Sequence, residues 1–243
     1  MKNTIGKAIR PIFIPNNNSV GVIEKEISFD WHMGMSNVVK QRSINNLHQK
    51  AREYGYLTML EASSKSENPL GIQLSAFFLK DKNGYAVENL FQSSKVFNPN
   101  VQFLDLLSVT PREAKKDARL RENGNLKTFR FKDKDYPLEP KSLFYDWLYT
   151  SVLYQKHNKK IMNSLIENNF SAFSDIEFNP KRSFNCQART LALFVSLYMN
   201  KVIDEFLSDP TSFLRNNNIY HFNENRKDDS FIDNDKQQLG LDF

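Results

Sequence analysis

Two side chains that can do chemistry stand seven residues apart in the stretch VENLFQSSKVF, residues 87–97. Glu88 can act as a general acid or base when an apolar pocket raises its pKa, and Lys95 can attack a carbonyl-like carbon when desolvation lowers its pKa. If the stretch is helical, Glu88, Gln92 and Lys95 share one stripe, with the outer Cα atoms ~10 Å apart. Lys95 then leans back toward Glu88. The alternative interpretation is an ion pair on a solvated helix surface.

The elements that must hold this pair are indicated by hydrophobic periodicity and turn residues. RPIFIP (10–15) and VGVIEKEISF (20–29), separated by NNNS, predict a hairpin, and LTMLE (57–61) predicts a short strand. A helix is expected from Ser36 to a stop at Gly55. Further helices are expected over residues 111–123 after a capping box at Thr110, from Ser142 onward, and over residues 187–207, with a short strand at KTFRFK (127–132).

Helical signals therefore dominate the chain after its first thirty residues. The sequence predicts a mainly α fold with a small β element near the N-terminus. No repeat and no linker composition divides it, so a single domain is expected over residues 1–223. The polar, charged segment 224–243 is expected to be a flexible tail.

The composition and charge of the chain indicate the compartment in which it acts and the kind of partner that it suits. No apolar run reaches the ~18 residues of a membrane span, and the N-terminus lacks the pattern of a signal peptide. One cysteine, Cys186, excludes an internal disulfide framework and favours a cytoplasmic protein. The net charge is +5, and because the tail holds six acids and three bases, the body carries +8. A basic body suits a polyanionic partner such as nucleic acid, although a generic basic surface explains the charge equally well.

Several common kinds of site are excluded by spacing. The four histidines, His32, His48, His157 and His221, form no ligand-spaced pair, so no metal is expected. Glycine is scarce, and neither a P-loop nor a GxGxxG motif is present, so no nucleotide cofactor of those classes is expected. Cys186 is better explained as a buried structural thiol than as a nucleophile.

Five polar clusters remain, each set beside aromatic residues. They are EASSKS (61–66), LSAF (74–77), VENLFQSSK (87–95), FYDW (144–147) and SDIEFNPKRSFNCQAR (174–189). Buried polar groups are costly unless they are paired, so polar residues among Phe and Trp often line a ligand site. Helix capping and backbone binding are the alternative for any single cluster.

In this order the clusters resemble the NADAR family (NAD- and ADP-ribose-associated), and most closely its antitoxins that accompany DarT-type ADP-ribosyltransferase toxins. The resemblance covers roughly residues 60–200, and VENLFQSSKVF carries its most specific motif. The helix TPREAKKDARL, the FYDWLY helix and the acidic loop FSDIEFNPK match further motifs. Three departures are an LSAF without the usual asparagine, Asn89 where histidine is usual, and no recognisable terminal WG loop.

The resemblance implies a glycohydrolase that removes ADP-ribose from guanine bases of DNA or RNA, with ADP-ribose as product and a DarT-like toxin as partner. It implies Glu88 and Lys95 as catalytic residues, through ribose ring opening, a covalent lysine adduct and hydrolysis. In a simpler route Glu88 activates water and Lys95 only neutralises charge, and Lys65 is a second candidate nucleophile. The substrate-binding residues expected from the clusters are Ser64, Lys65, Ser75, Phe77, Gln92, Trp147, Asp175, Glu177, Asn185 and Gln187.

Two other classes of function stay open. One is a non-catalytic module that binds ADP-ribose or NAD, motivated by LSAF and Asn89. The other is a plain nucleic-acid-binding protein, motivated by the basic body.

Overall fold

The computed structural model describes residues 5–217, so His221 and the predicted tail at 224–243 lie outside the described residues. The helices are α1 (Asn37–Glu53), α2 (Pro69–Gln73), α3 (Val87–Ser93), α4 (Pro111–Lys116), α5 (Arg119–Glu122), α6 (Leu143–Leu153), α7 (Lys159–Glu167), α8 (Gln187–Met199), α9 (Ile203–Ser208) and α10 (Pro210–Asn217), with 3-10 turns η1 (Leu104–Leu107) and η2 (Lys156–Asn158). The strands are β1 (Ile5–Pro15), β2 (Val22–His32), β3 (Met59–Glu61), β4 (Lys95–Phe97), β5 (Val101–Gln102), β6 (Leu126–Phe131), β7 (Lys134–Tyr136) and β8 (Ala172–Ser174).

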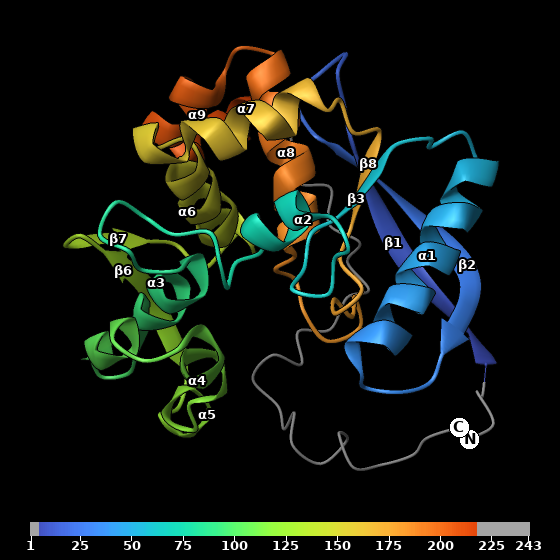
Figure 1. Ribbon diagram of the computed structural model, residues 1–243. Helices are drawn as coiled ribbons and strands as arrows, with labels where there is room; N and C mark the ends of the chain where they lie inside the picture. Colours follow the sequence, from blue (N-terminus) through green and yellow to red (C-terminus); the bar gives the residue numbers. More distant parts are fainter. Residues whose placement is uncertain (1–4, 218–243) are drawn as a thin grey trace.

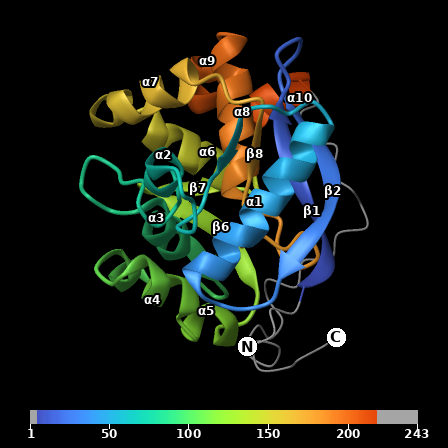
Figure 2. The same cartoon turned by 45° about the vertical axis from the view of Figure 1, so that its right-hand side comes forward.

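The first sheet has the order β2-β1-β8-β3 and is built on the predicted N-terminal hairpin. Strands β1 and β2 pair antiparallel from Ile5–His32 to Pro15–Val22. Alternate residues such as Ile12, Ile27 and Phe29 are buried, and α1 packs over them (Figures 1 and 2). The short strands β8 and β3 pair in parallel beside β1, so their carboxyl ends lie at the same edge.

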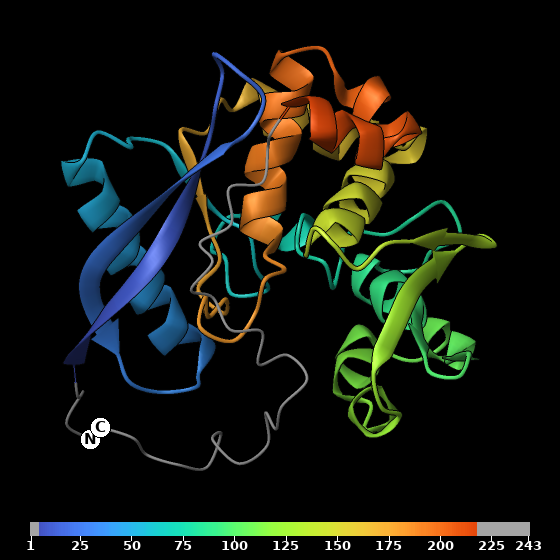
Figure 3. The same cartoon turned by 180° about the vertical axis from the view of Figure 1, so that it is seen from behind.

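A second sheet, of order β5-β4-β6-β7, overturns the prediction of a mainly α fold with a β element near the N-terminus only. Helix accounts for 43% and strand for 21% of the described residues, which makes the fold a mixture of α and β. The second sheet lies with α3, α4 and α5 at the opposite end of the molecule from the hairpin (Figures 1 and 3). Only KTFRFK was predicted in it, because strands of two or three residues are too short to show a period.

The main core joins the two ends. Helix α8 packs on β1, β8 and α6, and its buried face includes Leu191, Phe194 and Leu197. Helix α6 adds Phe144, whose ring stacks on Phe129 of the second sheet at 4.6 Å. Within residues 5–217 no helix combines the length and the apolar character that crossing a bilayer requires.

Most predicted helices form with modest changes of bounds. Ser36 caps α1 by accepting a hydrogen bond from Val39 N, and Gly55 ends it at φ +91°. The capping box at Thr110 is present, with Glu113 as its partner. The helix predicted over 111–123 is split into α4 and α5, because the Asp117 side chain bonds the backbone N–H of Arg119 and interrupts the ladder.

Buried His48 on α1 makes the stability of the fold depend on pH. Its Nε2 lies 2.8 Å from Ser174 Oγ, and since Ser174 donates its own proton to Glu61, the ring donates to Ser174. Burial, with a smaller contribution from Arg52, lowers the pKa of His48 to about 4. Its stabilising contribution is therefore full above the unfolded-state pKa of ~6.5 and is lost as pH falls through about 4.

We expect the free energy of unfolding of the wild type to fall by ~3 kcal/mol more than that of His48→Gln between pH 7 and pH 4. The glutamine amide can still donate to Ser174 but does not titrate. Urea unfolding followed by circular dichroism at both pH values gives the two differences. Equal losses in the two proteins would contradict a neutral buried imidazole.

Candidate active site

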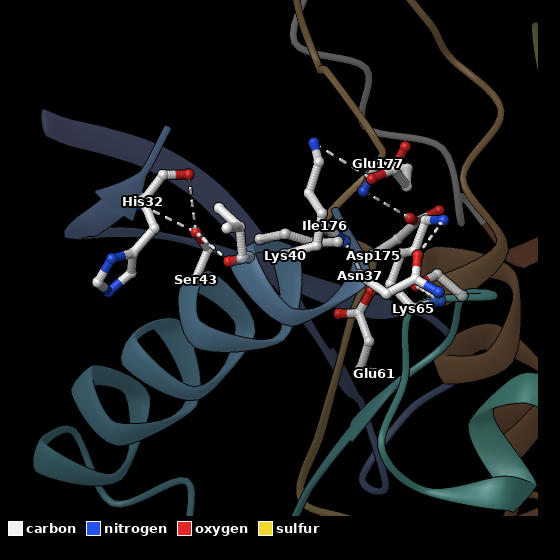
Figure 4. A network of polar contacts seen from close by, with 11 residues as sticks. His32, Asn37, Lys40, Ser43, Glu61, Lys65, Asp175, Ile176 and Glu177 are labelled. Atoms are coloured by element: carbon white, nitrogen blue, oxygen red, sulfur yellow. Dashed lines mark hydrogen bonds and ion pairs between the residues drawn. The ribbon is translucent and has the colours of Figure 1, made fainter. Parts of the chain in front are cut away.

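The candidate site begins where the parallel strands β3 and β8 end. Glu61 is the last residue of β3, and its buried carboxylate accepts hydrogen bonds from Ser63 Oγ at 2.7 Å, Ile176 N at 2.8 Å and Ser174 Oγ at 2.5 Å. Figure 4 shows Glu61 together with Asp175 and Ile176. These bonds tie the β3–α2 loop to the segment after β8. Gly71 allows this packing, because a Cβ there would meet the backbone oxygen of Glu61. Glu61 was not among the predicted site residues, although it ends a predicted strand.

Asp175 follows β8 directly and is held next to Glu61. Its carboxylate accepts from Glu177 N and from Gln187 Nε2, each at 3.0 Å. Burial raises the pKa of Asp175 to about 7, helped by the negative charge of Glu61 and opposed by the ammonium of Lys115. Asp175 is thus poised between its two protonation states near neutral pH.

A hydrogen-bond chain links Asp175 to the predicted catalytic helix. Gln187, at the start of α8, donates to Asp175 and accepts from Ala76 N at 2.7 Å. The carbonyl oxygen of Ala76 in turn accepts from Glu88 N at 2.9 Å. The structure therefore brings together Asp175, Gln187 and Glu88, three predicted site residues that are far apart in the sequence.

Glu88 stands in the first turn of α3 and is only 5% exposed. Val87, Leu90 and Phe91 bury the helix in the main core, which removes Glu88 from bulk water as well. Gln92 Nε2 donates to Glu88 Oε1 at 2.8 Å, one helical turn away. Glu88 and Gln92 therefore lie on the same side of α3, as their spacing in a helix predicts.

The helical stripe does not reach Lys95, so that part of the prediction is wrong. Helix α3 ends at Ser93, and Lys95 begins β4, where it pairs with Phe129 of β6. The hydroxyls of Ser93 and Ser94 both donate to Leu90 O, which satisfies a carbonyl at the helix end. The Lys95 ammonium lies 5.2 Å from the ring centroid of Phe91, on the helix that carries Glu88.

The charge of Lys115, which was not among the predicted residues, is coupled to Glu88. Lys115 lies on α4, and its ammonium is 5.4 Å from the ring centroid of Phe77. Glu88 raises the pKa of Lys115, with smaller contributions from Asp175 and Glu177, against the lowering effect of burial. The side chain is nevertheless accessible to solvent, so Lys115 is a protonated group at an open part of the site. Nothing in the spacing of TPREAKK indicated the direction in which it points.

Tyr145 on α6 completes the polar cluster from another side. Its ring meets Phe91 edge to face at 5.1 Å. Burial, then the charge of Glu88, raises the pKa of Tyr145 well above its usual value, so its hydroxyl stays protonated. Burial likewise raises the pKa of the Cys186 thiol, which supports its interpretation as structural. Tyr145 lies in the FYDW cluster, in which Trp147 is the predicted substrate-binding residue.

Three predicted substrate-binding residues carry buried polar atoms without a hydrogen-bond partner in the described part of the chain. They are Ser75 Oγ, Gln92 Oε1 and Asn185 Oδ1. A buried polar atom left unpaired costs ~1–3 kcal/mol, so such atoms are uncommon in folded proteins and frequently meet a ligand or water. Their presence beside Glu88 and Gln187 favours a polar ligand there.

Other predicted residues surround this cluster. The Lys65 ammonium donates to Asn37 Oδ1 at 2.7 Å, which connects the β3–α2 loop to the start of α1 (Figure 4). Glu177 is exposed and pairs with Lys40 at 3.3 Å. Ser64 is exposed in the same loop as Lys65.

Trp147 is placed elsewhere. Its indole N–H donates to Leu207 O at 3.0 Å, and its ring contacts Phe131, Tyr136 and Phe144. Since residues two apart on a helix point to nearly opposite sides, Trp147 faces away from the side of α6 that carries Tyr145. The structure does not bring Trp147 to the carboxylate cluster.

We expect Lys115→Gln to raise the pKa of Asp175 further above about 7, because the ammonium stabilises the charged carboxylate. A ¹³C NMR titration of the aspartate side-chain carboxyls measures it. Lys116→Gln is the matched control, since Lys116 is equally exposed on the same helix and is not a cause of the Asp175 shift. An unchanged Asp175 titration in Lys115→Gln would show that α4 does not face this loop.

Taken together, the carboxyl groups of Glu61, Glu88, Asp175 and Glu177 share one region with the Lys115 ammonium and the Tyr145 phenol. Such a region can transfer protons near neutral pH and can hold an anionic, hydroxyl-rich ligand.

Comparison with known families matches most of the chain. The family model described as DarT1-associated NADAR antitoxin matches residues 8–227. No curated protein matches the chain.

Proposed function

We propose that this chain, which belongs to the family of DarT1-associated NADAR antitoxins, removes ADP-ribose from guanine bases of nucleic acid by hydrolysing the N-glycosidic bond. The family supports an antitoxin role beside a DarT toxin. The observation that carries the chemical part is the buried Glu88 carboxylate, set beside unpaired polar atoms and a charged lysine. The site would act inside the cell on DNA or RNA that the toxin has modified.

In the proposed reaction Glu88 moves protons at the reacting centre. The ribose ring opens to leave an imine-like carbon bonded to the guanine nitrogen. The neutral Lys95 amine adds to that carbon, the guanine nitrogen takes a proton and leaves, and a Lys95 imine remains. Water then adds to the imine, Glu88 assists its deprotonation, and ADP-ribose departs with the lysine restored. One water is consumed for each base released.

The two lysines near α3 would have different roles. Glu88 keeps Lys115 protonated, which suits binding of the pyrophosphate of ADP-ribose and makes Lys115 a poor nucleophile. Lys95 lies against Phe91, on the helix that carries Glu88, and the family resemblance assigns the attack to it. Ser75, Gln92 and Asn185 would supply hydrogen bonds to the ribose hydroxyls and phosphates.

A second candidate function is favoured by the position of Lys95 outside the helical stripe. A module that binds ADP-ribose without turnover would need the polar atoms and Lys115 but no lysine positioned to attack the ribose. Such a module is expected to give a calorimetric binding signal with ADP-ribose and no released product.

The proposal is tested in cells by separating repair from inhibition of the toxin. Expression of the toxin is induced briefly and then stopped, and this chain is induced afterwards. ADP-ribose on guanine in isolated DNA should then fall faster than in cells that carry an empty vector. An identical decay in both cultures would leave only a role in binding the toxin or ADP-ribose.

A further inference from the structure

A cavity that the proposed chemistry does not use is lined by residues outside the carboxylate cluster. It has a volume of about 390 Å³, within the usual range for ligand pockets. Phe131, Tyr136 and Trp147 line it together with the lysines Lys82, Lys132 and Lys134. Trp147, which does not reach the carboxylate cluster, lines this cavity.

Positive charges meet aromatic rings on the β6–β7 side of the cavity. The ammonium of Lys132 lies 5.2 Å from the ring centroid of Phe131, and that of Lys134 lies 5.3 Å from the centroid of Tyr136. Tyr136 and Trp147 contact each other, with centroids 4.6 Å apart. Lys132 and Lys134 are exposed, so their charges are available to a ligand.

Two of the acidic groups near this cavity have partners within the fold. Asp81 accepts hydrogen bonds from the backbone of Asn83 and Tyr85, so its charge is satisfied by its own turn. Asp135 forms a bidentate pair with Arg130 at 2.6 and 3.0 Å. Exposed Asp133 is the remaining acid of this hairpin. The cavity therefore presents a net positive, aromatic surface.

The wall of the cavity opposite β6 and β7 includes Lys82, which lies in a loop that leads to α3, the helix that carries Glu88. Lys82 N donates to Gln155 Oε1 at 2.9 Å, and Asn158 Nδ2 donates to Lys80 O at 2.9 Å. The same loop enters α3, where Val87 N donates to Leu79 O. This loop therefore joins the wall of the cavity at Lys82 to the helix that carries Glu88.

We propose that this cavity binds single-stranded nucleic acid that flanks the modified base, an inference that rests on the proposed function for its substrate. Lysines on two walls would contact successive phosphates, and the rings would stack on a base. Stacking on aromatic side chains contributes ~1–3 kcal/mol per base and tolerates any sequence. A small anionic metabolite would use the lysines but would leave the three-ring wall without a function.

The test uses Lys82→Gln/Lys134→Gln in the full chain, with Lys7→Gln/Lys50→Gln as a control of equal charge change on the exposed outer surfaces of β1 and α1. Anisotropy of an unmodified, fluorescent single-stranded oligonucleotide is measured between about 50 and 200 mM salt. The cavity variant should bind several-fold more weakly, and its log–log salt slope should fall by ~1.4, or ~0.7 for each lost phosphate contact. The control should change affinity less.

A second readout reports on the rings. In a Trp31→Phe background Trp147 is the only tryptophan, and the oligonucleotide should quench its fluorescence under excitation selective for tryptophan. Unchanged affinity and salt slope in the cavity variant would overturn the proposal, and so would a loss of affinity equal to that of the control. A cavity variant that loses toxin binding but keeps oligonucleotide binding would also overturn it.

Failure of the proposed function gives a different result. Unmodified oligonucleotide binding requires no turnover, so it can be lost in the cavity variant even if ADP-ribose is never released. If turnover occurs, the variant should raise KM for a long modified oligonucleotide and leave the reaction of a modified mononucleoside unchanged.

Discussion

Replacement of Glu88 by glutamine is expected to lower the rate of ADP-ribose release by ~10² to 10⁴, the usual contribution of a positioned acid or base. The change preserves shape, and the amide can still accept the hydrogen bond from Gln92. The variant should therefore fold and should still bind ADP-ribose. Rates come from the intact mass of a modified oligonucleotide over time, and binding comes from calorimetry.

Glu122→Gln is the matched control for this experiment. Glu122 is an exposed carboxylate on α5, so its loss should leave both rate and binding unchanged. A Glu88→Gln protein that turns over at the wild-type rate would remove the carboxylate from the chemistry. A protein that loses rate and binding together would assign Glu88 to ligand binding.

Lys95→Ala and Lys95→Arg should both lose turnover by several orders of magnitude, as when a nucleophile is removed. The backbone of Lys95 pairs with Phe129, so either side chain leaves β4 intact. The guanidinium of the arginine variant keeps the charge but stays protonated and is a poor nucleophile. Turnover is measured on the same modified oligonucleotide.

Borohydride added during turnover identifies the lysine directly. The Lys95 imine should be reduced to a stable amine, and peptide mapping should place the adduct in FQSSKVF. An active Lys95→Arg protein would reduce Lys95 to a charge and leave the chemistry to Glu88 and water. Trapping at Lys65, whose amine bonds Asn37, would keep the mechanism and change the residue.

Local signals in the sequence predicted the elements that are long or capped. Each strand of the hairpin is eleven residues long, β2 alternates exposed and buried residues from Glu26 to Asp30, and α1 and α4 begin at hydroxyl caps. Helical spacing predicted that Glu88 and Gln92 lie on one stripe, and their hydrogen bond appeared only in the structure. Asp175 and Gln187 were named as site residues from polar clusters, and their direct hydrogen bond appeared only in the structure.

The site residues that the sequence misplaced or missed take their positions from contacts between distant segments. Lys95 lies outside the helix because β4 pairs with β6, which is more than thirty residues away in the sequence. The periodicity of VENLFQSSKVF does not indicate that pairing. Lys115 reaches the site across the fold, so its role could not be read from its own helix. Glu61 joins the site because the parallel strands β3 and β8 end at the same edge of the sheet, although more than a hundred residues separate them in the sequence.

The most direct test of the proposed activity is the intact mass of one guanine-ADP-ribosylated oligonucleotide, incubated with a small molar fraction of the purified full chain in EDTA. The account predicts that every strand loses the mass of one ADP-ribosyl group (ADP-ribose less one water), that free ADP-ribose accumulates, and that many strands are restored per protein molecule. A modified strand that keeps its mass after long incubation with excess protein, while the protein binds ADP-ribose, would contradict it.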